Sequence, residues 1–356
     1  MPARATVTVD LGKITDNTRR VRELLPGVEI VAVTKVTCGA PEVARAMLAG
    51  GATAIGDSRL ETVERMRAAG IDVPFWLLRA TPPALAADTV RLADVSLASE
   101  IVAVEALDRA AGAAGVRHGV LAMVDLGDLR EGMLPAELPE FVDRVAALAH
   151  IDLIGIGTSL TCYGGVVPDE RNLGELARLA HLAEERLGRP MLVSGGMSSS
   201  IDAALAGHLP GPVDSLRIGE SIILGVSTVT REPLPGLHTD AVTLEAPVIE
   251  CKLKPSMPIG EIAQDAFGNV PAFEDRGERR RAICAIGRQD APPGGLRPLD
   301  PRVEVLGASS DHLILDVHEL PEPPRVGDAI GFVPTYAATL ALFTSPYVDK
   351  VFVARE

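Results

Sequence analysis

The sequence predicts an α/β protein in which a (β/α)8 TIM barrel is followed by a C-terminal antiparallel β domain. Over residues 1–225, eight short apolar runs alternate with longer amphipathic runs, and each short run is followed by a crossover. After about residue 228 the helical periodicity disappears, and proline, glycine and short alternating runs take over. A doubly wound sheet is the competing fold. It requires fewer strands and a GxGxxG first turn, which residues 35–39 do not provide.

The barrel elements are predicted from the length and spacing of the apolar runs. Short apolar runs indicate buried strands, and the helical spacing of Leu173, Leu176 and Leu179 indicates one buried helix face. The predicted strands are residues 29–34, 52–56, 74–78, 94–98, 119–125, 152–157, 190–194 and 214–217. The predicted helices include residues 41–49, 60–69, 100–114, 137–149 and 173–187.

The second domain is predicted from strands separated by turn residues. We place the boundary between residues 1–228 and 229–356, with residues 231–236 as a linker rich in proline. Residues 6–10, within the segment 1–10, precede the barrel and are a candidate for an added strand of the second domain. The strands predicted there are residues 242–253, 281–286, 303–306, 313–317, 329–333 and 348–353.

Composition excludes several classes of function. The chain has 356 residues and a formal net charge of −14, which disfavours binding to nucleic acids or to anionic membranes. Its four cysteines are widely spaced and match no zinc pattern, so no metal site is expected. No signal peptide and no apolar stretch long enough to cross a bilayer is found, which makes the cytoplasm the expected location.

Chemistry-bearing residues follow several predicted strands. In a barrel, the carboxyl ends of the strands form the active site, and Lys35, Arg130, residues 158–165, residues 194–200 and Arg217 all follow a strand. A desolvated lysine with a lowered pKa is a candidate nucleophile for Schiff-base chemistry, although an ordinary lysine reaching solvent is the alternative. The glycine- and serine-rich turn after strand seven suits a phosphate. Together they suggest pyridoxal phosphate held as an imine on Lys35.

The whole chain resembles a known enzyme family. It is similar to the alanine racemase-type, fold type III, pyridoxal-phosphate enzymes, and most similar to their ornithine racemase-like branch. In the barrel the resemblance rests on AVTK (residues 32–35), VDLGDLREGM (124–133), GIGTSLTCYGG (155–165), SGGMSSS (194–200) and SLRIGE (215–220). In the second domain it rests on KPSMPIGEIAQDAFG (254–268), AIGRQD (285–290), LGASSDHLILD (306–316) and PTYAATLALFTSPYV (334–348).

The resemblance implies a role for each matching residue. Lys35 would bind the cofactor and act as one of two acid/base groups, and Arg217 would face the pyridine nitrogen. Arg130 would orient the substrate carboxylate, and Ser310 and Asp311 of the partner subunit would close the carboxylate site. The residues expected to bind the cofactor are Lys35, Ser194, Ser198, Arg217, Gly219, Glu220 and Tyr336.

The sequence departs from the family pattern where the second acid/base group is expected. The family uses a tyrosine lent by the partner subunit, and neither alignment of the segment around Asp265 yields one. Asp265 is our first choice, and its alternative role is that of a turn carboxylate. The other candidates are Glu261, Cys162, Tyr163 and Asp290. Ser159 replaces a ring-stacking histidine and Met123 a carbamate-bearing lysine, and these changes fit a longer, cationic substrate.

The resemblance therefore implies an amino-acid racemase acting on ornithine or another cationic amino acid. The alternatives are an alanine or broad-specificity racemase, a basic amino-acid decarboxylase and a pyridoxal-phosphate carrier without turnover. Because the family completes each barrel with a second subunit, the resemblance also implies a head-to-tail homodimer with shared active sites.

Overall fold

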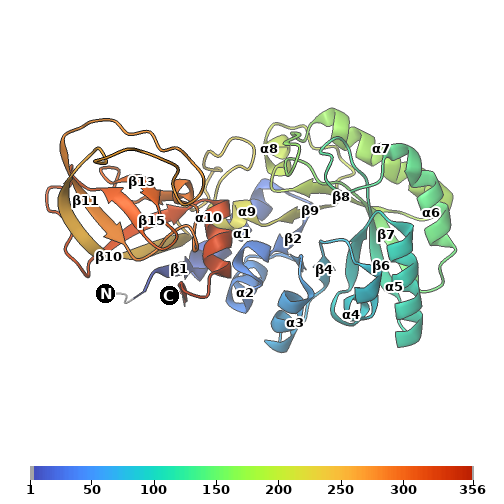
Figure 1. The fold of residues 1–356 in the computed structure, drawn as a ribbon. Coiled ribbons are helices and arrows are strands. Elements are labelled where there is room, and N and C mark those ends of the chain that lie inside the picture. Colours follow the sequence, from blue (N-terminus) through green and yellow to red (C-terminus); the bar gives the residue numbers. More distant parts are fainter. Residues whose placement is uncertain (1–3, 355–356) are drawn as a thin grey trace. The chain divides into compact units, whose positions relative to one another are not determined.

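The computed structural model describes residues 4–354 and divides the chain into two compact units. One unit is Leu11–Thr239, and the other joins the chain up to Asp10 to the chain from Asp240 onward. Figure 1 colours the chain from the N-terminus to the C-terminus, so the first unit runs from blue to yellow. Each unit is described by itself below.

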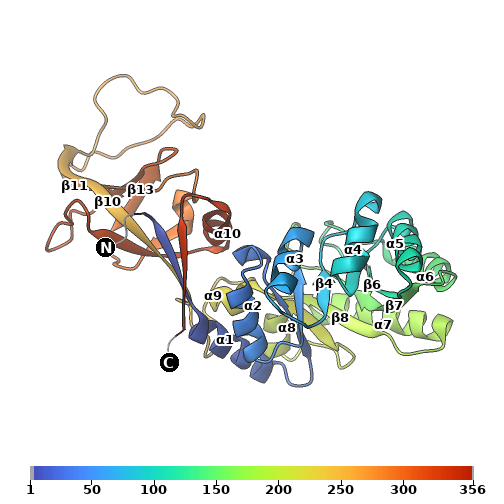
Figure 2. The same cartoon turned by 90° about the horizontal axis from the view of Figure 1, so that it is seen from below.

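The first unit is a closed barrel of eight parallel strands, as the sequence predicted (Figures 1 and 2). Every predicted strand is present, and most bounds differ by one or two residues. The strands are β2 (Glu29–Val33), β3 (Ala54–Asp57), β4 (Phe75–Leu77), β5 (Val95–Ala98), β6 (His118–Met123), β7 (Ile151–Gly157), β8 (Leu192–Met197) and β9 (Ser215–Ile218).

Helices cover the outside of this barrel. The sequence analysis did not identify α1, α4, α8 or α9, of which the last two are only a turn or two long. The helices are α1 (Leu11–Leu24), α2 (Pro41–Ala49), α3 (Leu60–Ala68), α4 (Ala86–Leu92), α5 (Ile101–Ala114), α6 (Leu138–Ala146), α7 (Glu170–Leu187), α8 (Ser200–Leu205) and α9 (Glu220–Leu224).

Helix α7 shows how local sequence sets these bounds. The Asp169 side chain accepts the Asn172 N–H at 2.7 Å, and Asn172 Oδ1 accepts the Asp169 N–H, so a capping box starts the helix at Glu170. Gly188 ends it in a left-handed conformation with φ 67°. Leu173 and Leu176 lie on the buried face, as their spacing predicted.

The two compact units divide between Thr239 and Asp240, whereas the boundary expected from the sequence lies between residues 228 and 229. The physical reason is a set of hydrogen bonds that holds the segment after α9 on the barrel. Asn17 Nδ2 on α1 donates to Ile222 O and to His238 O, each at 2.9 Å, and Asn17 Oδ1 accepts the His238 N–H. Asn17 is fully buried, so its side-chain amide depends on these partners in place of water.

We expect Asn17→Ala to lower the free energy of unfolding of the barrel by about 2–4 kcal/mol, because it leaves buried backbone groups unsatisfied. The single tryptophan, Trp76 on β4, is buried among barrel strands, so its fluorescence during urea unfolding reports on this unit. Asp16→Ala is the matched control, since Asp16 lies on the exposed face of the same helix and should change stability by less than about 0.5 kcal/mol. Equal effects of the two variants would contradict the proposed role of Asn17.

The second unit is built on a twisted β-sheet. Its hydrogen-bonded path runs β12–β15–β10–β11–β14–β13, and the early strand β1 pairs with β10 and with β16. The pairs are antiparallel except for β1 with β16, which is parallel. The strands are β1 (Thr6–Asp10), β10 (Val242–Pro255), β11 (Glu278–Cys284), β12 (Leu296–Pro298), β13 (Glu304–Ala308), β14 (Leu313–Asp316), β15 (Ala329–Pro334) and β16 (Asp349–Val353).

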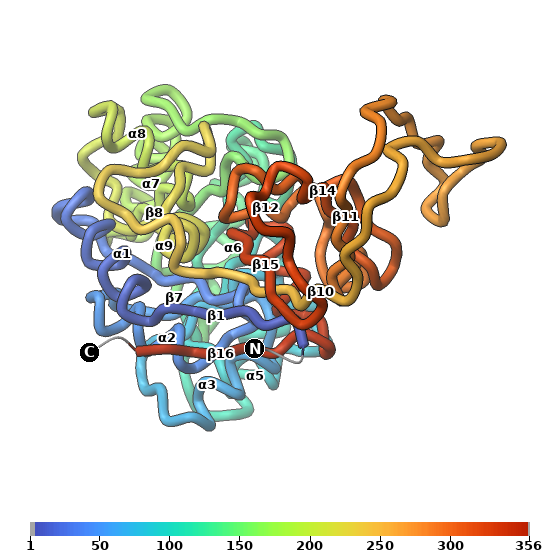
Figure 3. Tube along the Cα trace, turned by 90° about the vertical axis from the view of Figure 1, so that its left-hand side faces the viewer, coloured from blue at the N-terminus to red at the C-terminus, as the bar shows by residue number. Residues whose placement is uncertain are grey.

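Helix α10 (Tyr336–Thr344) corrects the expectation that helical structure ends near residue 228. This segment is apolar nearly all round, so it carries no amphipathic period that sequence reasoning can detect. Its buried residues include Ala338 and Leu342. A long segment, residues 256–277, joins β10 to β11 and extends away from the sheet of its own unit (Figures 2 and 3).

Candidate active site

Lys35 lies directly after β2, at the carboxyl end of the barrel. The chain turns there into the short 3-10 helix η1 (Lys35–Thr37). Thr34 Oγ1 donates a hydrogen bond of 2.7 Å to the buried carboxylate of Asp57, the last residue of the neighbouring strand β3. This bond fixes the end of β2 and therefore the starting point of the Lys35 side chain.

The surroundings of Lys35 favour its neutral, nucleophilic form. Burial lowers the pKa of Lys35, and the negative charge of a Cys162 thiolate opposes that shift. The Arg130 guanidinium lowers the pKa further, and the net pKa lies below the usual value for lysine. A lysine with a lowered pKa is the nucleophile that carbonyl chemistry requires.

Arg217 is buried on β9, which pairs with β2, the strand that Lys35 follows. Val31 on β2 is the register partner of Arg217. The guanidinium donates to Ser194 Oγ on β8 and to Thr158 O after β7. Burial lowers the pKa of Arg217 to about 10, with a further contribution from Arg130, so the group remains charged at neutral pH.

These residues fit pyridoxal phosphate. Arg217 is only 3% exposed, and the partners described above are neutral oxygens, so its charge can take a further acceptor such as a pyridine nitrogen. Thr158 Oγ1 is buried without a hydrogen-bond partner within residues 4–354. A nucleophilic lysine, a buried guanidinium and an unsatisfied hydroxyl suit an aldehyde cofactor that carries a ring nitrogen.

The predicted phosphate site has a different local structure from the one expected. Strand β8 continues through Gly195 and Gly196 to Met197, with an irregular register against β9, so the turn begins only at Ser198. Ser198 Oγ accepts the Ser221 N–H at 3.4 Å. This bond brings the turn after β8 next to the start of α9, where backbone N–H groups suit an anion.

Gly219 and Glu220 lie at the start of α9. A Cβ on Gly219 would lie 2.7 Å from Val33 O, so only glycine lets β9 approach β2 this closely. The Glu220 side chain forms an ion pair with Arg231. Burial raises the pKa of Glu220, and the Arg231 charge opposes that shift. Because the Glu220 side chain pairs with Arg231, its backbone N–H, and not its carboxylate, is the candidate ligand of an anion.

Arg130 links the loops that follow β6 and β7. Its Nη1 donates to Cys162 Sγ at 3.0 Å and its Nη2 donates to Ser159 Oγ at 2.9 Å, while Nη2 also pairs with Glu131. Arg130 Nε is buried and has no hydrogen-bond partner among the described residues. The guanidinium therefore retains a free donor at the barrel mouth.

Asp128 is a residue of this site that sequence reasoning missed. Its buried carboxylate accepts the backbone N–H groups of Cys162, Tyr163 and Val166 at 2.9–3.3 Å. Burial raises the pKa of Asp128, but these hydrogen bonds lower it more, so the carboxylate stays charged. An aspartate in a glycine-containing loop carries no signal that distinguishes this role from that of an ordinary turn residue.

The remaining predicted site residues belong to the second unit. Asp265, in the long segment 256–277, accepts the backbone N–H groups of Phe267 and Asn269 at 2.8 and 2.9 Å. These bonds, that from Asn269 first, lower the pKa of Asp265, as in a turn carboxylate.

Ser310 and Asp311 are exposed, and Ser310 Oγ donates to Asp311 Oδ1. Tyr336 is the first residue of α10. Among the other candidates for the second acid/base group, Asp290 accepts a hydrogen bond from Ser345 Oγ and is buried within its own unit. Glu261 and Tyr163 are exposed.

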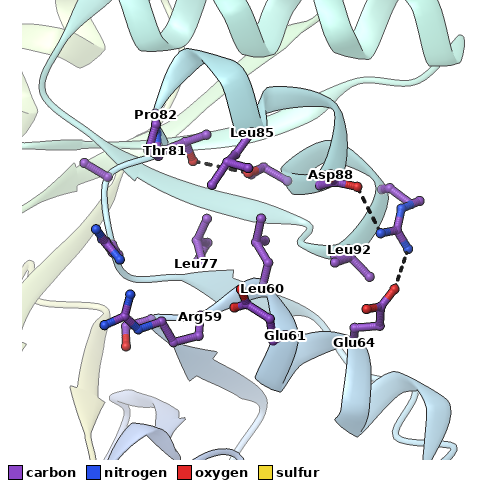
Figure 4. A pocket seen from close by; sticks show the side chains of 15 residues that line it. Arg59, Leu60, Glu61, Glu64, Leu77, Thr81, Pro82, Leu85, Asp88 and Leu92 are labelled. Carbon is purple, nitrogen blue, oxygen red and sulfur yellow. Dashed lines mark hydrogen bonds and ion pairs between the residues drawn. The ribbon is translucent and has the colours of Figure 1, made fainter.

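A cavity of about 240 Å³ lies in the first unit between α3 and α4 (Figure 4). Leu60, Leu77, Leu85 and Leu92 line its apolar side, and Arg91 bridges Asp88 and Glu64 at its edge. The residues that line it do not include those of the candidate active site, which is defined instead by the strand ends.

Within residues 4–354, no cluster of histidine, cysteine and acidic residues suits a metal ion. Over the same range, no helix combines the length and the apolar character that crossing a bilayer requires.

Known proteins identify the family. The sequence profile described as "Alanine racemase, N-terminal domain" matches residues 9–226. The chain is 40% identical to the ornithine racemase of Acetoanaerobium sticklandii, over 97% of this chain and 98% of that protein. It is 38% identical to the lysine racemase of Thermotoga maritima, over 97% of each.

A solved structure agrees with this similarity. The alanine racemase of Bartonella henselae, described with covalently bound pyridoxal phosphate, superposes with a TM-score of 0.74 at 18% identity, covering 99% of this chain and 100% of that one. Its fold is the barrel followed by a β domain that the sequence predicted. The matches of sequence and fold together show that the chain belongs to the alanine racemase family of pyridoxal-phosphate-dependent racemases.

Proposed function

We propose that this protein interconverts the L and D forms of a cationic amino acid, ornithine or lysine. The observation that carries the proposal is Lys35, a lysine with a lowered pKa at a strand end, beside the buried cation of Arg217. The substrate class is supported by similarity over nearly the whole chain to an ornithine racemase and a lysine racemase. The similarity to alanine racemases at comparable identity covers less than half of the chain.

Each residue of the barrel has a distinct task in this proposal. Pyridoxal phosphate, when bound, delocalises the electron pair left when the α-proton of the amino acid is removed. Lys35 would hold the cofactor covalently and, once released from it, would take up and return the α-proton on one face. Arg217 would donate an N–H to the ring nitrogen, and it keeps its own proton at neutral pH. An arginine in this position would leave the ring nitrogen unprotonated, which would favour simple proton exchange over decarboxylation.

The cofactor phosphate and the substrate carboxylate are assigned to separate groups. Ser194, Ser198 and the backbones of Gly219 and Glu220 would hold the cofactor, with Tyr336 as a further phosphate ligand. Arg130 would bind the substrate carboxylate, and the Glu131 side chain that pairs with it offers a negative charge at the same mouth.

We also propose a head-to-tail homodimer, located in the cytoplasm, in which the partner subunit supplies Ser310 and Asp311. Asp265 stays a prediction for the second acid/base group. Its carboxylate is occupied by hydrogen bonds of its own turn, and a lowered pKa makes it a weak proton donor.

The test is to incubate purified protein and pyridoxal phosphate with L-ornithine, L-lysine and L-alanine, and to separate the products by chiral chromatography. We expect D-ornithine or D-lysine at a rate at least about tenfold above that of D-alanine. Formation of a diamine and carbon dioxide would instead indicate the decarboxylase. Bound cofactor without turnover of any amino acid would indicate the carrier.

A further inference from the structure

The Cys162 thiol lies in the loop after β7, in contact with Arg130. Cys162 Sγ accepts a hydrogen bond of 3.0 Å from Arg130 Nη1, and its side chain is exposed in the loop after β7. Lys35 approaches from the end of β2. In the closed barrel, β8 and β9 lie between β7 and β2, so Cys162 and Lys35 follow strands that are not neighbours.

Arg130 contacts the thiol and is also the group proposed to bind the substrate carboxylate. In an α-amino acid the α-carbon is bonded directly to the carboxylate carbon. A carboxylate held by the Arg130 guanidinium therefore places the α-carbon close to a sulfur that contacts the same guanidinium at 3.0 Å. The charge of a Cys162 thiolate also acts on Lys35, so both groups lie within electrostatic range of one another.

The loop that carries Cys162 is rigidly built. The Asp128 carboxylate binds the backbone N–H groups of Cys162, Tyr163 and Val166, which fixes the backbone on both sides of the thiol. Thr161 adopts a positive φ of 55°. A Cβ on Gly164 would lie 2.6 Å from Asp128 O, so the tight wrapping of this loop requires glycine. A catalytic thiol needs this kind of fixed position.

We propose that Cys162 is the second acid/base group of the racemisation, so that both proton transfers are made by the barrel of one chain. This inference rests on the proposed function. In one direction, the Lys35 amine takes the α-proton, the S–H bond of Cys162 breaks, and its proton forms the new C–H bond on the opposite face. The resulting thiolate is stabilised by Arg130. In the other direction, the thiolate takes the proton and the Lys35 ammonium returns one.

The first experiment measures the washout of the α-hydrogen in D2O, starting separately from L- and D-ornithine or from L- and D-lysine. We expect Cys162→Ala to slow racemisation about 100-fold or more, and to lose washout from one enantiomer while keeping it from the other. A misfolded variant would lose both. Cys251→Ala, a change on β10, is the control and should keep wild-type washout from both enantiomers.

Three outcomes are decisive. Symmetrical washout by Cys162→Ala at the wild-type rate overturns the inference. If Asp265→Asn loses washout from one enantiomer only and Cys162→Ala loses none, the inference is also overturned, and the second acid/base group is Asp265. If the wild-type protein washes out neither enantiomer of ornithine or lysine, the proposed function fails independently of Cys162.

The second experiment needs no turnover. In the resting cofactor-bound protein, alkylation by iodoacetamide at pH 7 is followed for each cysteine by mass spectrometry. We expect Cys162 to react at least about tenfold faster than Cys251, and Arg130→Gln to slow Cys162 severalfold without changing Cys251. Equal rates for Cys162 in the two proteins would contradict the charge-assisted contact with Arg130.

Discussion

Lys35→Ala is expected to abolish racemisation, with a loss of at least about 10⁴-fold in kcat/KM. The variant removes both the covalent attachment of the cofactor and one of the two proton-transfer groups. Wild-type protein should show a visible absorption band from bound cofactor, and borohydride should fix the cofactor irreversibly to the peptide that contains Lys35. The variant should lose the fixed label.

The stability of this variant separates chemistry from folding. Lys35 is a partly buried amine whose pKa is lowered by burial, so its charge is not a source of stability, and removing it should leave the unfolding midpoint in urea nearly unchanged. Lys252→Ala is the matched control. That lysine is exposed on β10 and pairs with Glu250, so label and activity should both be retained. Fixation of the cofactor to a different lysine in wild-type protein would contradict the assignment.

Much of the fold could be predicted because barrel strands leave a strong signal. Parallel strands that are buried on both faces form continuous apolar runs, and the eight runs predicted here correspond to β2–β9. Elements without that signal were missed. Helix α10 is apolar nearly all round. Residues 231–236 have the composition of a linker, and only the hydrogen bonds between Asn17 and His238 show that the chain there is held on the barrel.

The site was predictable to the extent that strand order places residues together. Lys35 follows β2 and Arg217 lies on the adjacent strand β9, so barrel topology alone brings the two segments together. The contact between Arg130 and Cys162 depends on the path of two loops, and the role of Asp128 depends on N–H groups more than 30 residues away. Such long-range hydrogen bonds leave no periodic pattern in a sequence.

Asp128→Ala is expected to lower both the stability and the activity of the protein. The change removes the carboxylate that accepts the backbone N–H groups of Cys162, Tyr163 and Val166 in the loop after β7. The loss of this acceptor should lower the free energy of unfolding by about 2–4 kcal/mol. Because the same loop positions Cys162 beside Arg130, racemisation should also fall, by about 100-fold. Urea unfolding followed by Trp76 fluorescence measures the first effect, and chiral chromatography measures the second.

The pH dependence tests whether the Asp128 charge is responsible. The pKa of Asp128 is lower in the folded protein than its ordinary value of 3.8. Its stabilising contribution is therefore complete above that value and is lost as pH falls through the lower, folded-state pKa. The difference in stability between wild type and Asp128→Ala should be constant from pH 5 to 8 and shrink below about pH 4. Asp125→Ala is the control. Asp125 lies in the same loop as Asp128 but is partly exposed, and its carboxylate accepts the Gly127 N–H, so this change should lower the free energy of unfolding by less than about 1 kcal/mol. A difference that stays unchanged between pH 5 and pH 3 would show that side-chain shape, and not the charge that holds the Cys162 loop, stabilises this part of the barrel mouth.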